Sequence, residues 1–187
     1  MLARRQPSTF RIIGGKWCGR KIRFVPSIIL RASGERSRES LFNCLGQRLD
    51  GRACLDLFAG GGALGLEAAS RGAQRVVCVE QRAQTADDLR RATHILAADN
   101  VHIYRAEAES FLLNNRELFD VIFLDPPFAD YVHDSRWQHL LSLTASHLAA
   151  DGMVYCESDR YLPLPSGWHV QTQKKVGAVC WQLLRQQ

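Results

Sequence analysis

A glycine-rich segment lies between an apolar run and a helical pattern. It extends from Asp56 to Gly65 with the sequence Asp-Leu-Phe-Ala-Gly-Gly-Gly-Ala-Leu-Gly. Gly60, Gly62 and Gly65 have the G-x-G-x-x-G spacing with which a strand turns into a helix around a ligand. Glu80 ends the next predicted strand, where a carboxylate can accept both hydroxyls of a ribose. The spacing therefore predicts a site for a ribose-containing cofactor.

The acid at position 56 distinguishes between two cofactors that such a loop could bind. A dinucleotide contains a pyrophosphate, which is disfavoured beside the carboxylate of Asp56. S-adenosylmethionine has no phosphate, and its sulfonium and ammonium groups are both cationic, which suits a carboxylate-rich pocket. Asp56 therefore favours S-adenosylmethionine, with S-adenosylhomocysteine as the product. On the glycine spacing alone, a dinucleotide oxidoreductase is the alternative.

A second motif, Asp125-Pro126-Pro127-Phe128, directly follows the apolar run 119–124. In α/β sheets, ligands bind at the carboxyl ends of parallel strands. The two prolines stiffen this turn, so the Asp125 carboxylate and the Pro126 carbonyl can accept hydrogen bonds from one exocyclic amine. Phe128 offers an aromatic face on which a base can stack. The alternative is a proline-bent turn with Phe128 in the core.

Strand and helix patterns alternate from residue 52 onward, which predicts an α/β fold with a parallel sheet and helices on both faces. The last two strands are expected to be antiparallel neighbours. The predicted strands are 53–58, 75–79, 101–104, 119–124, 153–157, 168–172 and 178–184, and the predicted helices are 63–71, 82–97, 107–114 and 135–149.

The first fifty residues have a different pattern. Residues 10–25 contain two apolar runs around a glycine-rich turn, which predicts a hairpin with interleaved basic residues. Ser33 could cap a helix that has Glu35 in its first turn and that ends at Gly51. The apolar stripe of this helix would consist of Leu41, Phe42, Leu45 and Leu49.

Charge is unevenly distributed along the 187 residues. The 24 Lys and Arg against 19 Asp and Glu give a formal net charge of +5. Residues 1–48 contain eleven basic and two acidic residues, a balance of +9, and the remainder has a balance of −4. A basic segment beside an acidic body is typical of a protein that meets a polyanion, although a solvated surface gives the same counts.

Composition excludes several other classes of protein. With 46% hydrophobic and 23% charged residues, the chain is expected to form one compact globular domain without a membrane span or signal peptide. The six cysteines form no C-x-x-C pair and the six histidines show no metal-ligand spacing, so no metal site is expected. Free thiols among apolar neighbours are typical of a reduced, cytoplasmic protein.

The order of these motifs resembles that of class I S-adenosylmethionine-dependent amino-methyltransferases. Four segments, 11–20, 36–43, 56–72 and 125–128, more closely resemble the RsmD family, which methylates N2 of a guanine in bacterial 16S ribosomal RNA. The resemblance implies a Rossmann-like fold with a mostly parallel seven-stranded sheet and an antiparallel last strand. It also implies an N-terminal hairpin and helix over 1–50, which would contact RNA, before a methyltransferase domain over 51–187.

The resemblance also implies roles for individual residues. The cofactor-binding residues would be Asp56, Ala59, Gly60, Gly62, Glu80, Glu107 and Ala108. The target amine would be held by Asp125, Pro126 and Phe128. The RNA-binding residues would be Arg11, Lys16, Arg20, Lys21, Arg31, Arg36 and Arg38, while Trp17 would either stack on a base or pack against the sheet.

Two segments depart from the family pattern. Arg31-Ala32-Ser33 replaces the usual Arg-Pro-Thr, and Gly61 replaces a common Ser. We expect a monomer that acts on 16S ribosomal RNA within a 30S subunit or assembly intermediate. An adenine-N6 methyltransferase of DNA or RNA, which uses a similar clamp, is the alternative enzyme. A non-catalytic RNA-binding module would explain the charge but not an intact cofactor loop.

Overall fold

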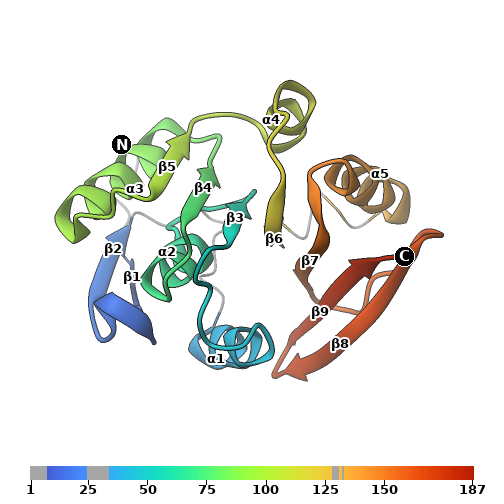
Figure 1. Ribbon diagram of the computed structural model, residues 1–187, viewed down its shortest axis with the longest axis horizontal. Helices are drawn as coiled ribbons and strands as arrows, with labels where there is room; N and C mark the ends of the chain where they lie inside the picture. The colour runs from blue at the N-terminus through green and yellow to red at the C-terminus, as the bar shows by residue number, and fades with distance from the viewer. Residues whose placement is uncertain (1–7, 25–33, 128–130, 132) are drawn as a thin grey trace, which may run out of the picture.

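The computed structural model describes residues 8–24, 34–127, 131 and 133–187. Seven strands form one sheet in the order β5-β4-β3-β6-β7-β9-β8 (Figure 1). Their bounds are β3 Ala53–Asp56, β4 Arg75–Val79, β5 Val101–Tyr104, β6 Phe119–Leu124, β7 Leu148–Ser158, β8 Trp168–Val176 and β9 Val179–Gln186. The neighbours from β5 to β7 are parallel, and β9 is antiparallel to both β7 and β8. The predicted, mostly parallel seven-stranded sheet with an antiparallel last strand is confirmed.

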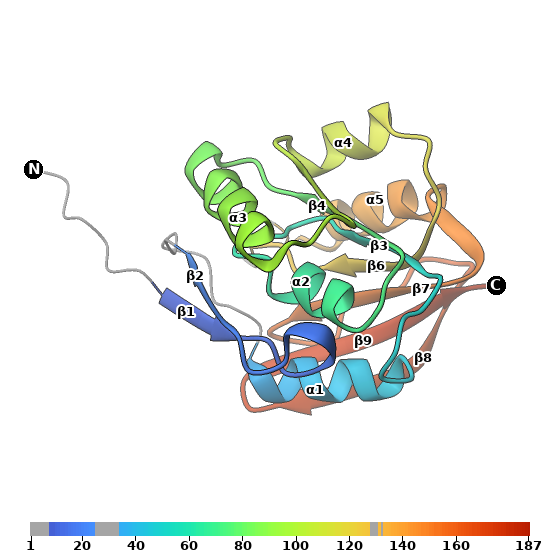
Figure 2. The same ribbon diagram turned by 60° about the vertical axis from the view of Figure 1, so that its left-hand side comes forward.

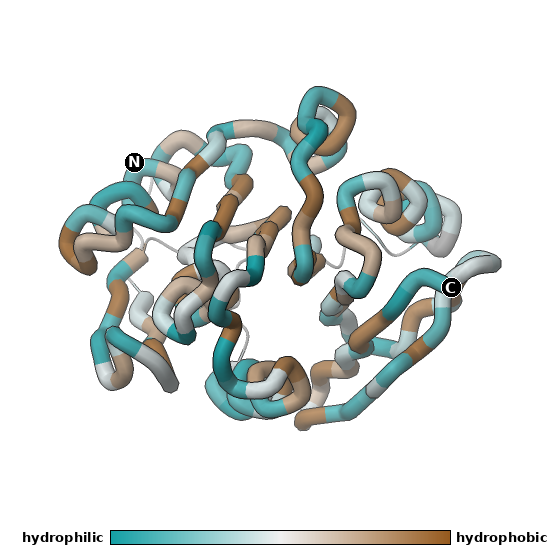
Figure 3. The backbone as a smooth tube through the Cα atoms, in the orientation of Figure 1, coloured by the Kyte–Doolittle hydropathy of each residue, from teal (hydrophilic) through white to brown (hydrophobic). Residues whose placement is uncertain are grey.

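Helices cover both faces of the sheet, as the alternating pattern predicted. On one face lie α1 (Glu35–Cys44), α2 (Ala63–Ser70) and α3 (Ala83–Leu96), and on the other lie α4 (Ala108–Asn114) and α5 (Asp134–Ala145) (Figure 1). Each face has its own cluster of buried apolar side chains. The central strands β4 and β6 are hydrophobic over much of their length because both of their sides are buried (Figure 3).

The N-terminal segment forms the predicted hairpin, from β1 (Ser8–Arg11) and β2 (Lys21–Phe24), with a 3₁₀ turn, η1 (Gly15–Trp17), between them. The hairpin and α1 lie on the same side of the molecule as α2 (Figure 2). Side chains of the hairpin belong to the same apolar cluster as α2 and α3, namely Phe10, Ile12, Trp17, Ile22 and Phe24. The extension therefore shares the core of the sheet.

Two predicted helix ends are wrong. α1 ends at Cys44 instead of continuing to Gly51, because Gly46 and Gln47 have positive φ angles of 94° and 64°. Its predicted apolar residues Leu45 and Leu49 are buried beyond the helix. α5 ends at Ala145 and β7 begins at 148, where the chain pairs with the start of β6, so cross-strand pairing replaces the last helical turn.

All six cysteines are free thiols. Across the described residues, no group of His, Cys, Asp and Glu side chains is arranged to hold a metal ion. Over the same part of the chain, none of the helices has both the length and the hydropathy that crossing a membrane requires.

Candidate active site

The two sequence motifs meet at one edge of the sheet. Asp56 ends β3 and pairs with Phe123 of the adjacent parallel strand β6, two residues before Asp125. The next strand on the other side, β4, ends directly before Glu80. Chain connections leave β3 and β6 in opposite directions across the sheet, and such a switch point is where open α/β sheets bind ligands.

The glycine loop is shaped by close packing on both of its sides. Gly60 and Gly62 have φ angles of 52° and 84°, a left-handed conformation that favours glycine. A Cβ atom at Gly61 would lie 2.8 Å from the ring of Phe24 in β2. A side chain at position 61 would therefore collide with the Phe24 ring of the hairpin, which packs against the loop.

Asp56 is a buried carboxylate, 1% exposed, with one hydrogen-bonded oxygen. Its Oδ2 accepts a hydrogen bond of 2.8 Å from the backbone N–H of Gly65 in the first turn of α2. Its Oδ1 has no hydrogen-bonding partner among the described residues. Burial raises the pKa of Asp56 to about 7, the N–H group of Gly65 opposes this shift, and the negative charge of Glu80 adds to it.

Glu80 fixes the opposite side of the loop. Its Oε2 accepts a hydrogen bond of 3.0 Å from the N–H of Gly60, and its Oε1 accepts one of 2.8 Å from the N–H of Arg82. Burial raises the pKa of Glu80, while these two N–H groups oppose the shift. The loop is therefore held between two buried carboxylates, Asp56 and Glu80.

These residues fit S-adenosylmethionine. The unpartnered Oδ1 of Asp56 is an anionic acceptor, and a cationic group is the partner that would offset its burial. Side chains are excluded from the loop, since a Cβ atom at Gly62 would lie 2.4 Å from Leu89 and one at Gly65 would lie 2.5 Å from Cys78. Asp56 would face the cationic part of the cofactor and Glu80 its ribose.

Glu107 and Ala108 follow β5 at the same edge of the sheet. Glu107 is the N-cap of α4, where its Oε2 accepts a hydrogen bond of 2.8 Å from the N–H of Ser110. Ala108 is buried. Glu107 thus has an established structural role, and its role in binding adenine stays a prediction.

The Asp125 motif follows β6 as predicted. Asp125 is half-buried and Pro126 is buried, while Phe128 lies outside the described residues. The neighbouring strand β7 adds a feature that sequence reasoning missed, because Tyr155 donates a hydrogen bond of 2.7 Å to the buried carboxylate of Glu157. Register pairs Leu124 with Cys156, so Asp125 and Glu157 lie side by side at the carboxyl ends of adjacent strands.

The predicted RNA-binding residues divide into exposed and buried positions. Lys16, Arg20, Lys21 and Arg36 are exposed, and Arg11 is exposed and pairs with Glu35 at 2.9 Å. Arg31 lies outside the described residues. Trp17 is only 6% exposed and packs in the core, so of its two predicted roles, packing is correct and stacking on a base is not.

Arg38 is the exception, and its assignment as an RNA contact is wrong in this structure. Its side chain is fully buried, with Nη1 3.6 Å from the Glu67 carboxylate and Nη2 donating to the carbonyl of Arg11 at 2.9 Å. A buried, paired guanidinium cannot reach a phosphate. The reason is tertiary: α1 packs against α2 with Arg38 between them.

Glu67, which sequence reasoning also missed, connects the extension to α2. Its carboxylate accepts hydrogen bonds from the N–H groups of Ile13 at 2.8 Å and Gly14 at 2.9 Å, and pairs with Arg71 at 2.8 Å. Ser70 supports the same turn by donating to the carbonyl of Gly14 and accepting from the N–H of Trp17. An available signal was that Glu67 is the only charged residue of the helix 63–70, whose other residues are apolar except for Ser70.

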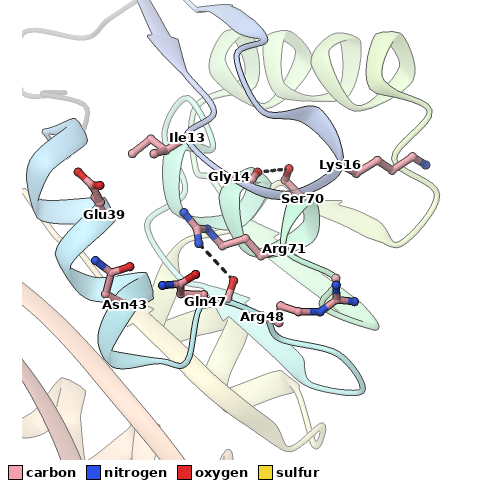
Figure 4. A pocket seen from close by; sticks show the side chains of 11 residues that line it. Ile13, Gly14, Lys16, Glu39, Asn43, Gln47, Arg48, Ser70 and Arg71 are labelled. Carbon is pink, nitrogen blue, oxygen red and sulfur yellow. Dashed lines mark hydrogen bonds between the residues drawn. The ribbon is translucent and has the colours of Figure 1, made fainter.

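A cavity of about 670 Å³ lies at the opposite end of α2 from the glycine loop, between η1 and the end of α1 (Figure 4). Arg71 lies across it and donates to the carbonyl of Gln47 at 3.2 Å. Lys16 and Arg48 also line the cavity, and Figure 4 shows their side chains extending outward. The cavity belongs to the basic extension and is separate from the acidic edge of the sheet.

The architecture is that of class I S-adenosylmethionine-dependent methyltransferases. A solved structure of this fold, that of a 16S rRNA N2 methyltransferase (RsmC) from Thermus thermophilus in complex with AdoMet and guanosine, superposes with a TM-score of 0.71. The alignment covers 97% of this chain and 50% of that one at 23% identity. At this identity the likeness shows the fold.

Closer similarity identifies the family. The family model described as "Conserved hypothetical protein 95" matches residues 10–185. Ribosomal RNA small subunit methyltransferase D of Escherichia coli (strain K12) is 34% identical over 188 residues, covering 95% of this chain and 90% of the relative. A putative methyltransferase, yhhF, from Escherichia coli superposes with a TM-score of 0.81 at 32% identity, covering 96% and 98% of the two chains. The chain belongs to this family, the RsmD family of methyltransferases.

Proposed function

We propose that this protein transfers a methyl group from S-adenosylmethionine to the exocyclic N2 amine of a guanine in 16S ribosomal RNA. The observation that supports this most directly is the placement of Asp56 and Asp125 at the carboxyl ends of the adjacent parallel strands β3 and β6, at the switch point of a methyltransferase sheet. The names of the similar relatives support a small-subunit ribosomal RNA as the substrate.

The cofactor, when bound, supplies a methyl group on a sulfonium, which is already activated for transfer. The protein must therefore chiefly orient the acceptor amine, whose lone pair is delocalised into the guanine ring. The two N–H groups of this amine donate hydrogen bonds to the Asp125 carboxylate and to the carbonyl of Pro126, so that the nitrogen moves toward tetrahedral geometry and its lone pair is freed. Phe128 stacks on the unpaired base.

Proton removal can occur at the same carboxylate. The amine becomes more acidic as the new bond forms, so Asp125 accepts the proton, or water accepts it later. Exposed cations of the extension, Lys16, Arg20, Lys21 and Arg36, bind the RNA backbone. The target base then enters at the acidic edge, while the backbone stays on basic surface.

The cellular context is part of the proposal. We infer a cytoplasmic monomer that acts on 16S ribosomal RNA in a 30S subunit or an assembly intermediate. The six free thiols are consistent with a reducing compartment.

The test is transfer of labelled methyl groups to 16S RNA, naked and in 30S particles, both from a strain that lacks the enzyme. We expect label in N2-methylguanosine after nucleoside analysis. Label in N6-methyladenosine would replace the base assignment with the adenine alternative. Absence of transfer to either substrate would overturn the proposed function.

A further inference from the structure

A second basic segment lies at the C-terminal end of the chain. Residues 160–187 contain four basic residues and no Asp or Glu, whereas residues 49–159 contain nine basic and seventeen acidic residues. The acidic charge is therefore concentrated in the middle of the chain, between two basic segments. The basic residues of the second segment are Arg160, Lys174, Lys175 and Arg185.

Strand register places two of these lysines at the active edge of the sheet. Leu124 of β6 pairs with Cys156 of β7, so the next residues, Asp125 and Glu157, lie side by side. Glu157 pairs with Trp181 of β9, and Trp181 pairs with Lys174 of β8. Three strand spacings of about 4.8 Å place the backbones of Asp125 and Lys174 roughly 14 Å apart.

Both lysines are exposed at the turn between β8 and β9. Lys174 donates a hydrogen bond of 3.0 Å from Nζ to Ser40 of α1 and lies 5.7 Å from the centre of the Trp181 ring. These contacts orient one ammonium group toward the α1 side, and Lys175 follows on the opposite face of the strand. α1, whose first turn contains the exposed Arg36, lies beside this turn (Figure 1).

We infer that the β8–β9 turn, through Lys174 and Lys175, is a second contact surface for the phosphodiester backbone of the RNA substrate, on the far side of Asp125 from the N-terminal hairpin. The inference rests on the proposed function. Phosphates require cations within reach of the reacting base, and the two acids that hold the glycine loop at this edge, Asp56 and Glu80, are buried. A distance of roughly 14 Å corresponds to about four nucleotides at the 3.4 Å rise per strand of a duplex.

Lysines on an edge strand have another known use, since they discourage pairing between exposed strand edges. β8 is one of the two edge strands of the sheet, so this explanation competes with RNA binding. The two differ in what a charge change affects. Protection of the edge affects aggregation, whereas a phosphate contact affects RNA affinity and its dependence on salt.

The experiment compares K174E/K175E with R116E/R185E, which changes net charge equally at the opposite end of the strands. Both are measured for cofactor affinity, thermal stability, binding of a 16S RNA transcript and methyl transfer to 30S particles. We expect K174E/K175E to weaken RNA binding and raise KM for RNA at least about tenfold, with cofactor affinity unchanged. The control should stay within about twofold of the unmodified protein.

Two further variants separate charge from folding. K175E alone leaves the contact between Lys174 and Ser40 in place, and K174Q/K175Q should reduce the slope of log affinity against log salt by about 2. RNA affinity within twofold of the control, with an unchanged salt slope, would overturn the inference. If the unmodified protein binds the transcript but transfers no methyl group, the proposed function fails, and RNA binding by these variants still tests the surface.

Discussion

Two buried carboxylates, Asp56 at the end of β3 and Glu67 in α2, have opposite surroundings. Glu67 in α2 has two arginines, Arg38 and Arg71, and two backbone N–H groups around it. Asp56 accepts a hydrogen bond through Oδ2 from the same helix, two residues before Glu67. Among the described residues no basic side chain forms an ion pair with Asp56, and its Oδ1 has no hydrogen bond. Both are almost completely buried.

The difference separates a structural charge from a binding charge. Glu67 is fully compensated within the protein, so it joins the N-terminal extension to α2 and leaves nothing for a ligand. Asp56 is buried without a cation beside it, and this burial raises its pKa to about 7. A buried carboxylate without a neighbouring cation is thermodynamically unfavourable, and a cationic ligand would offset that cost, which is typical of a ligand site.

The largest effect is expected at Glu67, the carboxylate whose charge is neutralised within the protein. Glu67→Gln removes the carboxylate that pairs with Arg38 and Arg71, so the free energy of unfolding should fall by about 3–5 kcal/mol. Urea denaturation monitored by tryptophan fluorescence measures it. A loss smaller than about 1 kcal/mol would show that Glu67 does not hold the extension in place.

Asp125 should affect the reaction without affecting stability or cofactor binding. Asp125→Ala removes the proposed acceptor for the target amine, so methyl transfer should fall at least about 100-fold. Calorimetry should give cofactor affinity within twofold of the unmodified protein. Asp159→Ala, at an exposed acid of the same edge, is the control. Equal loss of transfer and cofactor affinity in Asp125→Ala would contradict this assignment.

Asp56→Asn tests the carboxylate that has no cationic partner within the described protein. The variant keeps the size of the side chain but loses the charge that a cationic cofactor needs, so affinity should fall about tenfold to a hundredfold. Its stability at pH 8 should equal or exceed that of the unmodified protein, since a buried charge has been removed. Unchanged affinity for S-adenosylmethionine would show that Asp56 is not its partner.

The pH dependence of stability gives a finer measure of the same charge. The folded protein holds the Asp56 proton up to about pH 7, whereas the unfolded chain loses it near pH 3.8. Between about pH 4 and 7 the folded state therefore binds more protons, and its stability decreases as pH rises, by up to ~1.4 kcal/mol per pH unit. Above pH 7 this contribution is constant.

Unfolding curves of the unmodified protein and Asp56→Asn between pH 5 and 8 provide the measurement. The free energy of unfolding of the unmodified protein, minus that of Asp56→Asn, should decrease as the pH rises from 5 to 7. The raised pKa of Glu80 adds a slope of the same sign to both proteins, so it cancels in the difference. Parallel curves would show that Asp56 does not titrate in this range.

The smallest effect is expected at an exposed ion pair. Glu35→Gln breaks the pair with Arg11, in which both side chains are about half exposed to solvent. Water solvates both partners nearly as well when they are apart, so the melting temperature should not change measurably. A clear decrease would remove the distinction between exposed and buried pairs on which the comparison depends.

Local patterns were enough to predict the elements that position the site. The strands 75–79, 101–104 and 119–124 were predicted with their observed bounds, because short apolar runs ended by turn residues determine buried strands. Helix ends were less predictable. α1 ends at Cys44, before the left-handed turn at Gly46 and Gln47, and α5 ends before β7. A left-handed turn and cross-strand pairing outweigh an apolar stripe that would permit either helix to continue.

The sequence by itself determined the alternating α/β pattern, the glycine loop and the acids at the strand ends, because these depend on neighbouring residues. Only the tertiary structure decided which charges are available. Arg38 and Arg36 are equivalent in a count of charge, yet one is buried against Glu67 and the other is exposed. Likewise, Lys174 reaches the active edge only through pairing across four strands. Burial and register depend on residues far apart in the chain, and they set the energy of a charge and its distance from the site.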